Sequence, residues 1–258
     1  MEKRTNQQLK GLIRCTKYAF MPNRLHFCGP ENQADILEFY AQTTANKAPK
    51  TIKPLLEKFE TMYPYLKLIA RANNVKNPLD EKIVEAYWLG NEQLGNISLS
   101  ALYYHLTDAL KIDKKLGMKK FNKFKEALDK KALPHHNFHV FSVWRRTGST
   151  QDWHTLASID ACRISWGVIS QTEKEILVKT RPLNMDERGQ IFEGQTIEKK
   201  AIYQTEGQTL VKNLKIGDLV SLHWGAICEK INTRQGQVLQ KITDLCLSLI
   251  NTEIIAGA

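Results

Sequence analysis

The chain has 258 residues, of which 42% are hydrophobic and 25% are charged, as in an ordinary globular protein. This composition excludes a disordered chain, and the lack of any apolar run of about eighteen residues excludes a membrane-spanning helix. The first residues lack the apolar segment of a secretion signal, and the five scattered cysteines do not indicate a disulfide framework. We therefore expect a cytoplasmic protein with reduced thiols and no membrane partner.

The formal net charge of +10 lies almost entirely in the first half of the chain. Residues 1–134 contain 23 Lys and Arg against 14 Asp and Glu, a balance of +9, whereas residues 135–258 contain 14 against 13, a balance of +1. A field of this sign favours an anionic partner, such as an acidic protein, an anionic small molecule or nucleic acid. The alternative is that lysines on helix surfaces serve solubility alone.

Apolar residues at helical spacing dominate the first 133 residues. Asn32 is the predicted start of a short helix, and a continuous apolar stripe predicts one helix over 53–71 with a kink at Pro64. Pro78 and the acidic residue Asp80 predict a helix over 81–89. A further helix is predicted to begin at Ser98 or Ser100, and the nine lysines of 111–131 surround two helices that Gly117 separates.

After Pro134 the pattern changes to the alternation that is typical of strands. The candidate strands are Phe138–Arg146, Ala161–Ile169, Ile176–Thr180, Gln190–Glu193, Thr196–Gln204 and Leu219–Trp224. Thr233 can cap a last helix with one apolar stripe. The fold class is therefore α+β: an N-terminal basic helical half (1–133) is followed by a mostly antiparallel β half closed by a C-terminal helix (134–258). We expect the two to pack as one globular unit.

Three histidines fall within five positions, at His135, His136 and His139. In a strand, positions four apart lie about 13 Å from each other, so His135 and His139 cannot share an ion. Positions three apart face opposite ways, so His136 and His139 cannot share one either. A metal site would need partners from elsewhere in the chain, or would use His135 and His136 together. Hydrogen-bonded structural or catalytic imidazoles are the preferred interpretation.

Cys28 and Cys162 differ in their expected surroundings. Cys28 lies in a turn that leads to a helix N-terminus, with Arg24 and His26 nearby, and such surroundings lower a thiol pKa and favour a nucleophile or a metal ligand. An inert buried thiol is the alternative. Cys162 shares strand parity with Ile164 and Trp166, so we expect it in the core.

Several other side chains could contribute to a site. His223 lies on the more polar face of its strand and can point into a cleft, and Glu85 can orient an imidazole or act as a base. Arg163 can line a pocket, while Arg145 and Arg146 can clamp an anionic group. Structural hydrogen bonds and ion pairs are the alternative for each of them.

No nucleotide-binding loop, zinc-protease motif, paired-cysteine motif or nucleophile elbow is present. Four stretches together resemble an uncharacterised family of bacterial and archaeal proteins known as a domain of unknown function. They are His26–Pro30, Glu85–Asn91, Pro134–Phe141 and Ser221–Trp224. The resemblance covers most of the chain and implies no established activity. It implies relatives encoded near nickel-iron hydrogenase maturation functions, and hence a protein that handles a metal or a small ligand.

Two functional hypotheses follow. The first is an accessory protein or enzyme with a Cys/His pocket between the two halves, which could hold a transition metal in hydrogenase-type maturation. Its candidate catalytic residues are Cys28, Glu85, His135, His136 and His223, and its candidate substrate-binding residues are His26, His139, Arg145, Arg146 and Arg163. The second is a nucleic-acid-binding module that uses the Lys111–Lys131 patch, although Phe121 and Phe124 within it fall at inward helical spacing.

Overall fold

The computed structural model describes residues 6–31, 52–128, 132–144, 155–205 and 207–257. The predicted helix that begins at Asn32 lies outside these residues. The helices before the sheet are α1 (Asn6–Arg24), α3 (Ile52–Glu57), α4 (Met62–Ala72), α5 (Glu81–Trp88), the 3-10 helix η1 (Glu92–Asn96), α6 (Leu99–Tyr104), the π-helix η2 (His105–Ala109), α7 (Ile112–Leu116), α8 (Met118–Ala127), α9 (His136–Phe138), the π-helix η3 (His139–Trp144) and α11 (Leu156–Cys162). The last helix is α12 (Thr233–Gly257).

An antiparallel sheet follows α11. Its five strands lie in the order β5 (Ile197–Ala201), β2 (Ile176–Thr180), β1 (Ser165–Gln171), β8 (Leu219–His223) and β9 (Ala226–Lys230). Two small hairpins complete the β half: β3 (Leu183–Met185) with β4 (Ile191–Glu193), and β6 (Gln204–Thr205) with β7 (Gln208–Thr209). The α+β prediction is therefore confirmed, with helices first, then an antiparallel sheet, then a C-terminal helix.

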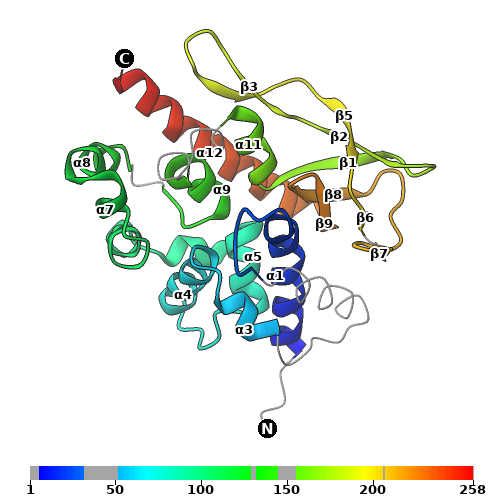
Figure 1. Ribbon diagram of the computed structural model, residues 1–258, viewed down its shortest axis with the longest axis horizontal. Helices are drawn as coiled ribbons and strands as arrows, with labels where there is room; N and C mark the ends of the chain where they lie inside the picture. The colour runs from blue at the N-terminus through cyan, green and yellow to red at the C-terminus, as the bar shows by residue number, and fades with distance from the viewer. Residues whose placement is uncertain (1–5, 32–51, 129–131, 145–154, 206, 258) are drawn as a thin grey trace.

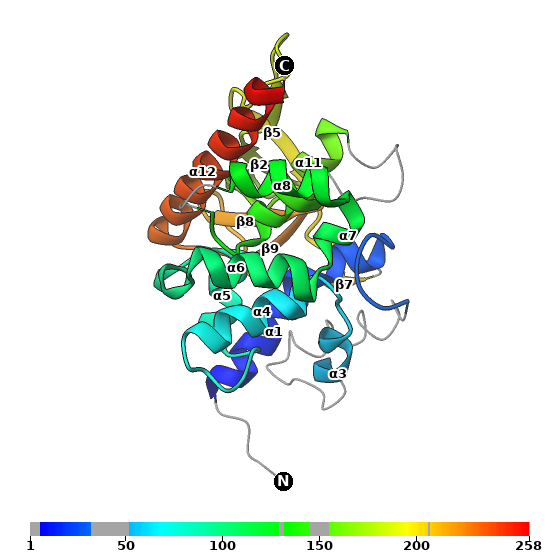
Figure 2. The ribbon, with the colours of Figure 1, turned by 90° about the vertical axis from the view of Figure 1, so that its left-hand side faces the viewer.

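The helical and β halves share one hydrophobic core. Figure 1 shows helices α1, α3, α4 and α5 on one side of the molecule and the sheet on the other. Helix α1 packs against α5 on one side and against β8 and β9 on the other. Arg14 Nε donates to Glu229 Oε1 at 2.8 Å, and the hydroxyl groups of Tyr18 and Ser221 are hydrogen-bonded at 2.7 Å, so α1 also has polar links to the sheet. Helix α12 runs along one side of the molecule (Figure 2) and contacts α9, η3 and the β3–β4 hairpin. The domain boundary between 133 and 134 stays a prediction.

Helix α1 was not predicted from the sequence, although one of its faces is deeply buried. Leu12, Cys15 and Ala19 follow helical spacing and are at most 2% exposed. Gly11 lets this helix approach the turn before α5, because a Cβ atom there would lie 2.1 Å from the carbonyl oxygen of Leu79. A larger residue at position 11 would therefore force α1 away from α5.

Three predictions about local structure were wrong. The expected kinked helix over 53–71 is two helices, because residues 58–61 are not helical. Pro64 lies in the first turn of α4, where a missing N–H is tolerated. The expected strand Phe138–Arg146 is helical over its described part, since α9 and η3 are apolar on several sides and burial outweighs the strand preference of Val and Phe. The expected strand Ala161–Ile169 begins only at Ser165, because α11 extends to Cys162.

Other predictions of local structure are confirmed. The strand Ile176–Thr180 has the predicted bounds, and β4, β5 and β8 lie within their predicted ranges. Helix α5 is capped by Asp80, whose side chain accepts from the Lys82 amide, and Ser98 caps α6 as expected. Within the described ranges, no helix has both the length and the apolar character needed to cross a bilayer.

Asn137 is a buried polar link between α9, the start of β1 and α12. Its side-chain amide accepts from the Ile164 amide at 2.7 Å and donates to the Ile164 carbonyl at 3.1 Å and to Thr243 Oγ1 at 3.3 Å. Removing it leaves buried donors and acceptors unpaired. We predict that Asn137→Ala lowers the free energy of unfolding by about 3 kcal/mol in urea denaturation.

The matched control for this substitution is Asn122→Ala on the exposed face of α8, which should change stability by less than about 0.5 kcal/mol. A loss below about 1 kcal/mol at Asn137 would show that this hydrogen-bonded link does not hold α9 against the start of β1 and α12.

Candidate metal site

Three side chains with metal-binding atoms meet at the boundary between helices and sheet. His136 lies in the first turn of α9, Cys162 ends α11 and His223 ends β8. Their ligand atoms all lie within 4.8 Å of one another, and Cys162 Sγ is 4.0 Å from His136 Nε2. His136 and His223 are buried, and Cys162 is half-buried. Within the described part of the chain, this is the one group of three His, Cys, Asp or Glu residues with such spacing.

Local structure brings each of these residues to its place. His135 caps α9, since its Nδ1 accepts from the Asn137 amide at 3.0 Å, and this directs the next residue, His136, inward. Thr155 caps α11 through the Ser158 amide and so fixes where that helix delivers Cys162. His223 directly precedes the tight turn that joins β8 to β9.

The His223 ring is already oriented as a ligand. Its Nδ1 donates to the Tyr18 carbonyl oxygen at 2.8 Å, which leaves Nε2 as the nitrogen with the lone pair. Nε2 is buried and has no hydrogen-bond partner. Burial lowers the pKa of His223 to about 4, so the ring is neutral at physiological pH. In many metal sites, the ring nitrogen of a histidine that does not bind the metal donates a hydrogen bond to a backbone carbonyl oxygen, which fixes the orientation of the ring.

His136 makes hydrogen bonds through both ring nitrogens. Nε2 donates to the Cys162 carbonyl oxygen at 2.9 Å, so Nδ1 accepts from the Tyr87 hydroxyl at 3.3 Å. Burial, and secondarily the neighbouring His223, lower the pKa of His136 well below its ordinary value. If Nε2 bound a metal, its proton would move to Nδ1, and the Tyr87 oxygen would then accept the hydrogen bond.

The Cys162 thiol is protonated in the metal-free protein. Burial raises its pKa well above the ordinary value, the Cys28 thiol raises it further, and the Trp224 indole N–H opposes both effects. Burying a thiolate without a positive partner is unfavourable. A metal ion would supply that partner.

A cavity of about 90 Å³ adjoins the three residues. Its walls are largely aromatic and apolar, and they include Phe27, Phe59, Met62 and Trp88. The Trp88 ring packs on both imidazoles, with ring centroids 4.6 Å from His136 and 5.6 Å from His223. A cation here would lie in a medium of low dielectric, where its electrostatic effect on a bound molecule is strong.

The structure brings together some of the residues proposed from the sequence. Cys28, His136, His139 and His223 all line this cavity, which agrees with a pocket between the two halves. Their catalytic or substrate-binding roles stay predictions. Cys162 was expected in a strand core and instead belongs to the site. The signal for it was the Thr155 cap and the helical sequence after it, which together predict that Cys162 ends a helix.

Other candidates lie elsewhere. His135 is buried and acts as a helix cap, with a pKa lowered to about 3 by burial. Glu85 accepts hydrogen bonds from Asn91 and Gln235 near the start of α12, and His26 is exposed. Arg163 is 1% exposed and pairs with Asp160 and Glu193 rather than facing the cavity. Arg145 and Arg146 lie outside the described residues.

The donor set fits a transition metal. Two imidazoles and a thiolate suit Zn²⁺, Ni²⁺ or copper, and three protein ligands leave one coordination position open. Tetrahedral zinc with nitrogen and sulfur ligands needs donor atoms about 3.3 to 3.6 Å apart. The atoms here, within 4.8 Å of one another, would move together by about 1 Å or less.

The fold and the site define an α+β protein with a buried His-Cys-His group. The chain belongs to the family of unknown function DUF6390, whose family model matches residues 7–256. This confirms the resemblance to a domain of unknown function, and nothing in the match links the chain to hydrogenase maturation. No curated protein and no solved structure shows detectable similarity to the chain.

The pKa of Cys28 differs from the expectation. Its thiol was expected to have a lowered pKa, but burial raises it to about 11, and the hydrogen bond with the Gly29 backbone only partly compensates. Since only the thiolate reacts, we predict that alkylation of Cys28 by iodoacetamide in the metal-free protein accelerates about tenfold per pH unit from pH 7 to pH 10. Peptide mass spectrometry would follow the rate, with Cys28→Ser as the control. A plateau near pH 8 would contradict the raised pKa.

Proposed function

We propose that this protein binds one transition-metal ion through His136, Cys162 and His223. The observation that carries the proposal is the buried, unpaired Nε2 of His223, which its hydrogen bond to Tyr18 aims at two other donor atoms. A buried polar atom without a partner costs about 1 to 3 kcal/mol. Coordination of a metal would remove that cost.

The donor types favour particular ions. Ca²⁺ and Mg²⁺ prefer oxygen ligands, and the group contains none. Zn²⁺ accepts this set without a geometric preference of its own, and Ni²⁺ and copper also bind imidazole and thiolate. The thiolate would neutralise one of the two positive charges of a divalent ion.

A fourth coordination position would be accessible from the cavity, because all three residues line it, and its walls are largely apolar. Three protein ligands with an accessible fourth position are typical of zinc sites that act on a bound molecule, whereas structural zinc sites have four protein ligands. A metal held here would act as a Lewis acid on a small ligand in the cavity. The function that this arrangement supports best is thus the binding or activation of a small molecule by a resident metal.

A role in the maturation of nickel-iron hydrogenase stays a prediction. It would require the site to select nickel, and elemental analysis of the protein purified under anaerobic conditions would test that directly. Nickel in preference to zinc would support the role, and zinc alone would count against it.

Nucleic-acid binding by the Lys111–Lys131 patch also stays a prediction. Phe121 and Phe124, the aromatic residues interleaved with these lysines, are each 1% exposed and belong to the core, so they are not available to stack on bases. The metal site has the stronger support, because its three residues come from three separate elements and meet at one point.

The first test of the metal site compares two cysteines of the same cavity. We predict that the wild-type chain binds one Zn²⁺ or Co²⁺ ion and that Cys162→Ser weakens binding at least about 100-fold, since loss of a ligand costs more than loss of a residue that orients one. Cys28→Ser is the matched control and should bind within about threefold of the wild type. Competition with a chromophoric chelator measures both. Equal loss in the two variants, or none in either, would contradict the proposed ligand set.

The pH dependence of binding provides a second test. Both imidazoles are already neutral at physiological pH, because burial lowers their pKa values, whereas the Cys162 thiol is protonated and must lose its proton. We predict that one proton is released per metal ion and that affinity rises about tenfold per pH unit between pH 6 and pH 8. Calorimetry in two buffers of different ionisation enthalpy gives the proton count. Release of no proton, or of two, would contradict this assignment.

A further inference from the structure

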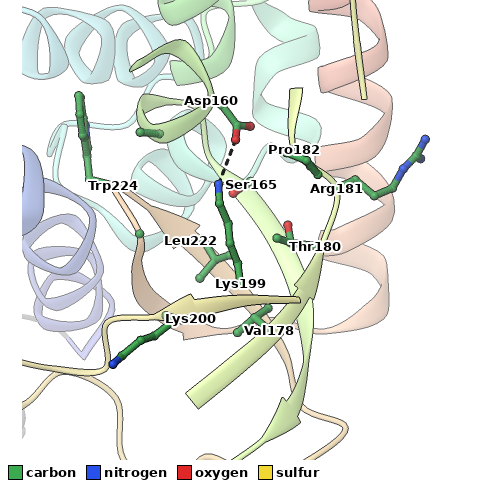
Figure 3. Close-up of a pocket in the computed structure, with 13 residues that line it drawn as sticks. Asp160, Ser165, Val178, Thr180, Arg181, Pro182, Lys199, Lys200, Leu222 and Trp224 are labelled. Atoms are coloured by element: carbon green, nitrogen blue, oxygen red, sulfur yellow. Dashed lines mark hydrogen bonds and ion pairs between the residues drawn. The ribbon is translucent and has the colours of Figure 1, made fainter. Parts of the chain in front are cut away.

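A second cavity, of about 280 Å³, lies over the sheet beside the C-terminal end of α11 (Figure 3). We call it the outer cavity. Its floor is largely apolar and includes Val178 on β2, Ala201 on β5 and Leu222 on β8, each at most 6% exposed, with Ser165 and Thr180 also in the lining. Trp224 forms one wall. An apolar floor with an aromatic wall suits the flat body of an organic molecule.

Charge at this cavity is not balanced. Asp160 pairs with Arg163 at 3.0 Å and with Lys199 at 3.3 Å, while Glu193 pairs with Arg163 at 2.9 Å and with Arg181 at 3.6 Å. Three cations therefore share two carboxylates, which leaves a net charge of +1.

Lys199 is the member of this network that faces the cavity. In Figure 3 its side chain extends over the apolar floor toward Asp160, whereas Arg181 points away. The Lys199 side chain is 54% exposed, so its ion pair with Asp160 is weak and can be exchanged for a ligand anion. The remaining lysine of the lining, Lys200, is paired with Glu175 at 2.9 Å.

Trp224 is held in an unfavourable backbone conformation. The β8–β9 hairpin closes with the two residues Trp224 and Gly225, whose φ angles are 51° and 74°. Such turns favour Asn-Gly or Gly-Gly, and a bulky residue at positive φ is strained. Strain of this kind is concentrated at functional sites. Trp224 lines both the outer cavity and the metal cavity, and its ring stacks on Phe27 of the metal cavity with ring centroids 4.0 Å apart.

We propose that the outer cavity binds a planar organic anion of the aromatic carboxylate class. The flat body lies on the apolar floor against Trp224, and the carboxylate pairs with Lys199, where it compensates the surplus positive charge. This site does not require a metal ion, so it stands or falls separately from the His136, Cys162 and His223 site.

The test uses metal-free protein and 2-naphthoate as the probe, with the neutral 2-naphthalenemethanol for comparison. Indole ¹⁵N–¹H resonances are followed by NMR, and Trp224→Phe identifies the signal of Trp224. We expect a saturable shift of that signal with 2-naphthoate and binding at least about fivefold weaker with the neutral compound.

Lys199→Met should weaken 2-naphthoate binding about fivefold or more, and Lys241→Met, which removes an exposed lysine on α12, should leave it unchanged. Each of three outcomes would overturn the proposal: no saturation at millimolar 2-naphthoate, equal binding of the neutral compound, or equal effects of the two lysine substitutions. Metal binding, measured separately by chelator competition, is not affected by any of these outcomes.

Discussion

The structure depends on the hydrogen bond between the His223 ring and the Tyr18 carbonyl oxygen. This 2.8 Å contact joins the end of β8 to the middle of α1, and α1 is the helix that packs on both the other helices and the sheet. A buried imidazole offers two nitrogens, and satisfying one of them by the backbone fixes the tautomer and the direction of the other. The same interaction that holds the helical half against the sheet therefore also presents an unpaired nitrogen to the cavity between them.

Burial determines the chemistry of this cavity. Without an ion, burial keeps His136 and His223 neutral and the Cys162 thiol protonated, so the site carries no charge that would destabilise the fold. A metal ion would favour the deprotonated form of the Cys162 thiol, whereas the two imidazoles would stay neutral. His223 is ready to coordinate, whereas His136 must exchange its hydrogen bond with the Cys162 carbonyl for the ion, with Tyr87 as the new partner of its other nitrogen. The site is thus only partly preorganised. Tyr87 allows the exchange in a buried position, because its hydroxyl group can accept the hydrogen bond from His136 Nδ1.

The sequence predicted the fold class and much of the sheet, and in β2 the alternation reflects one buried and one exposed face. Burial does not alternate in β5, which is mostly exposed, or in β8, which is mostly buried. The prediction failed at residues 138–144, where Val and Phe favour a strand but burial on several sides produces α9 and η3. Because of that error, His136 and His139 were expected on opposite faces of a strand, whereas in a helix both can line the cavity. Cys162 was missed for the same reason, because its helix was interpreted as part of a strand. The cavity is built by residues far apart in the chain, and no local pattern reports which of them meet.

The most direct test of the central claim is a crystal structure of the protein loaded with Zn²⁺, with anomalous scattering recorded on both sides of the zinc absorption edge. We predict one anomalous peak, about 2.0 to 2.1 Å from His136 Nε2 and His223 Nε2 and about 2.3 Å from Cys162 Sγ, with the hydrogen bond from His223 to Tyr18 retained. A zinc peak bound elsewhere, or coordination that leaves out His223, would contradict it.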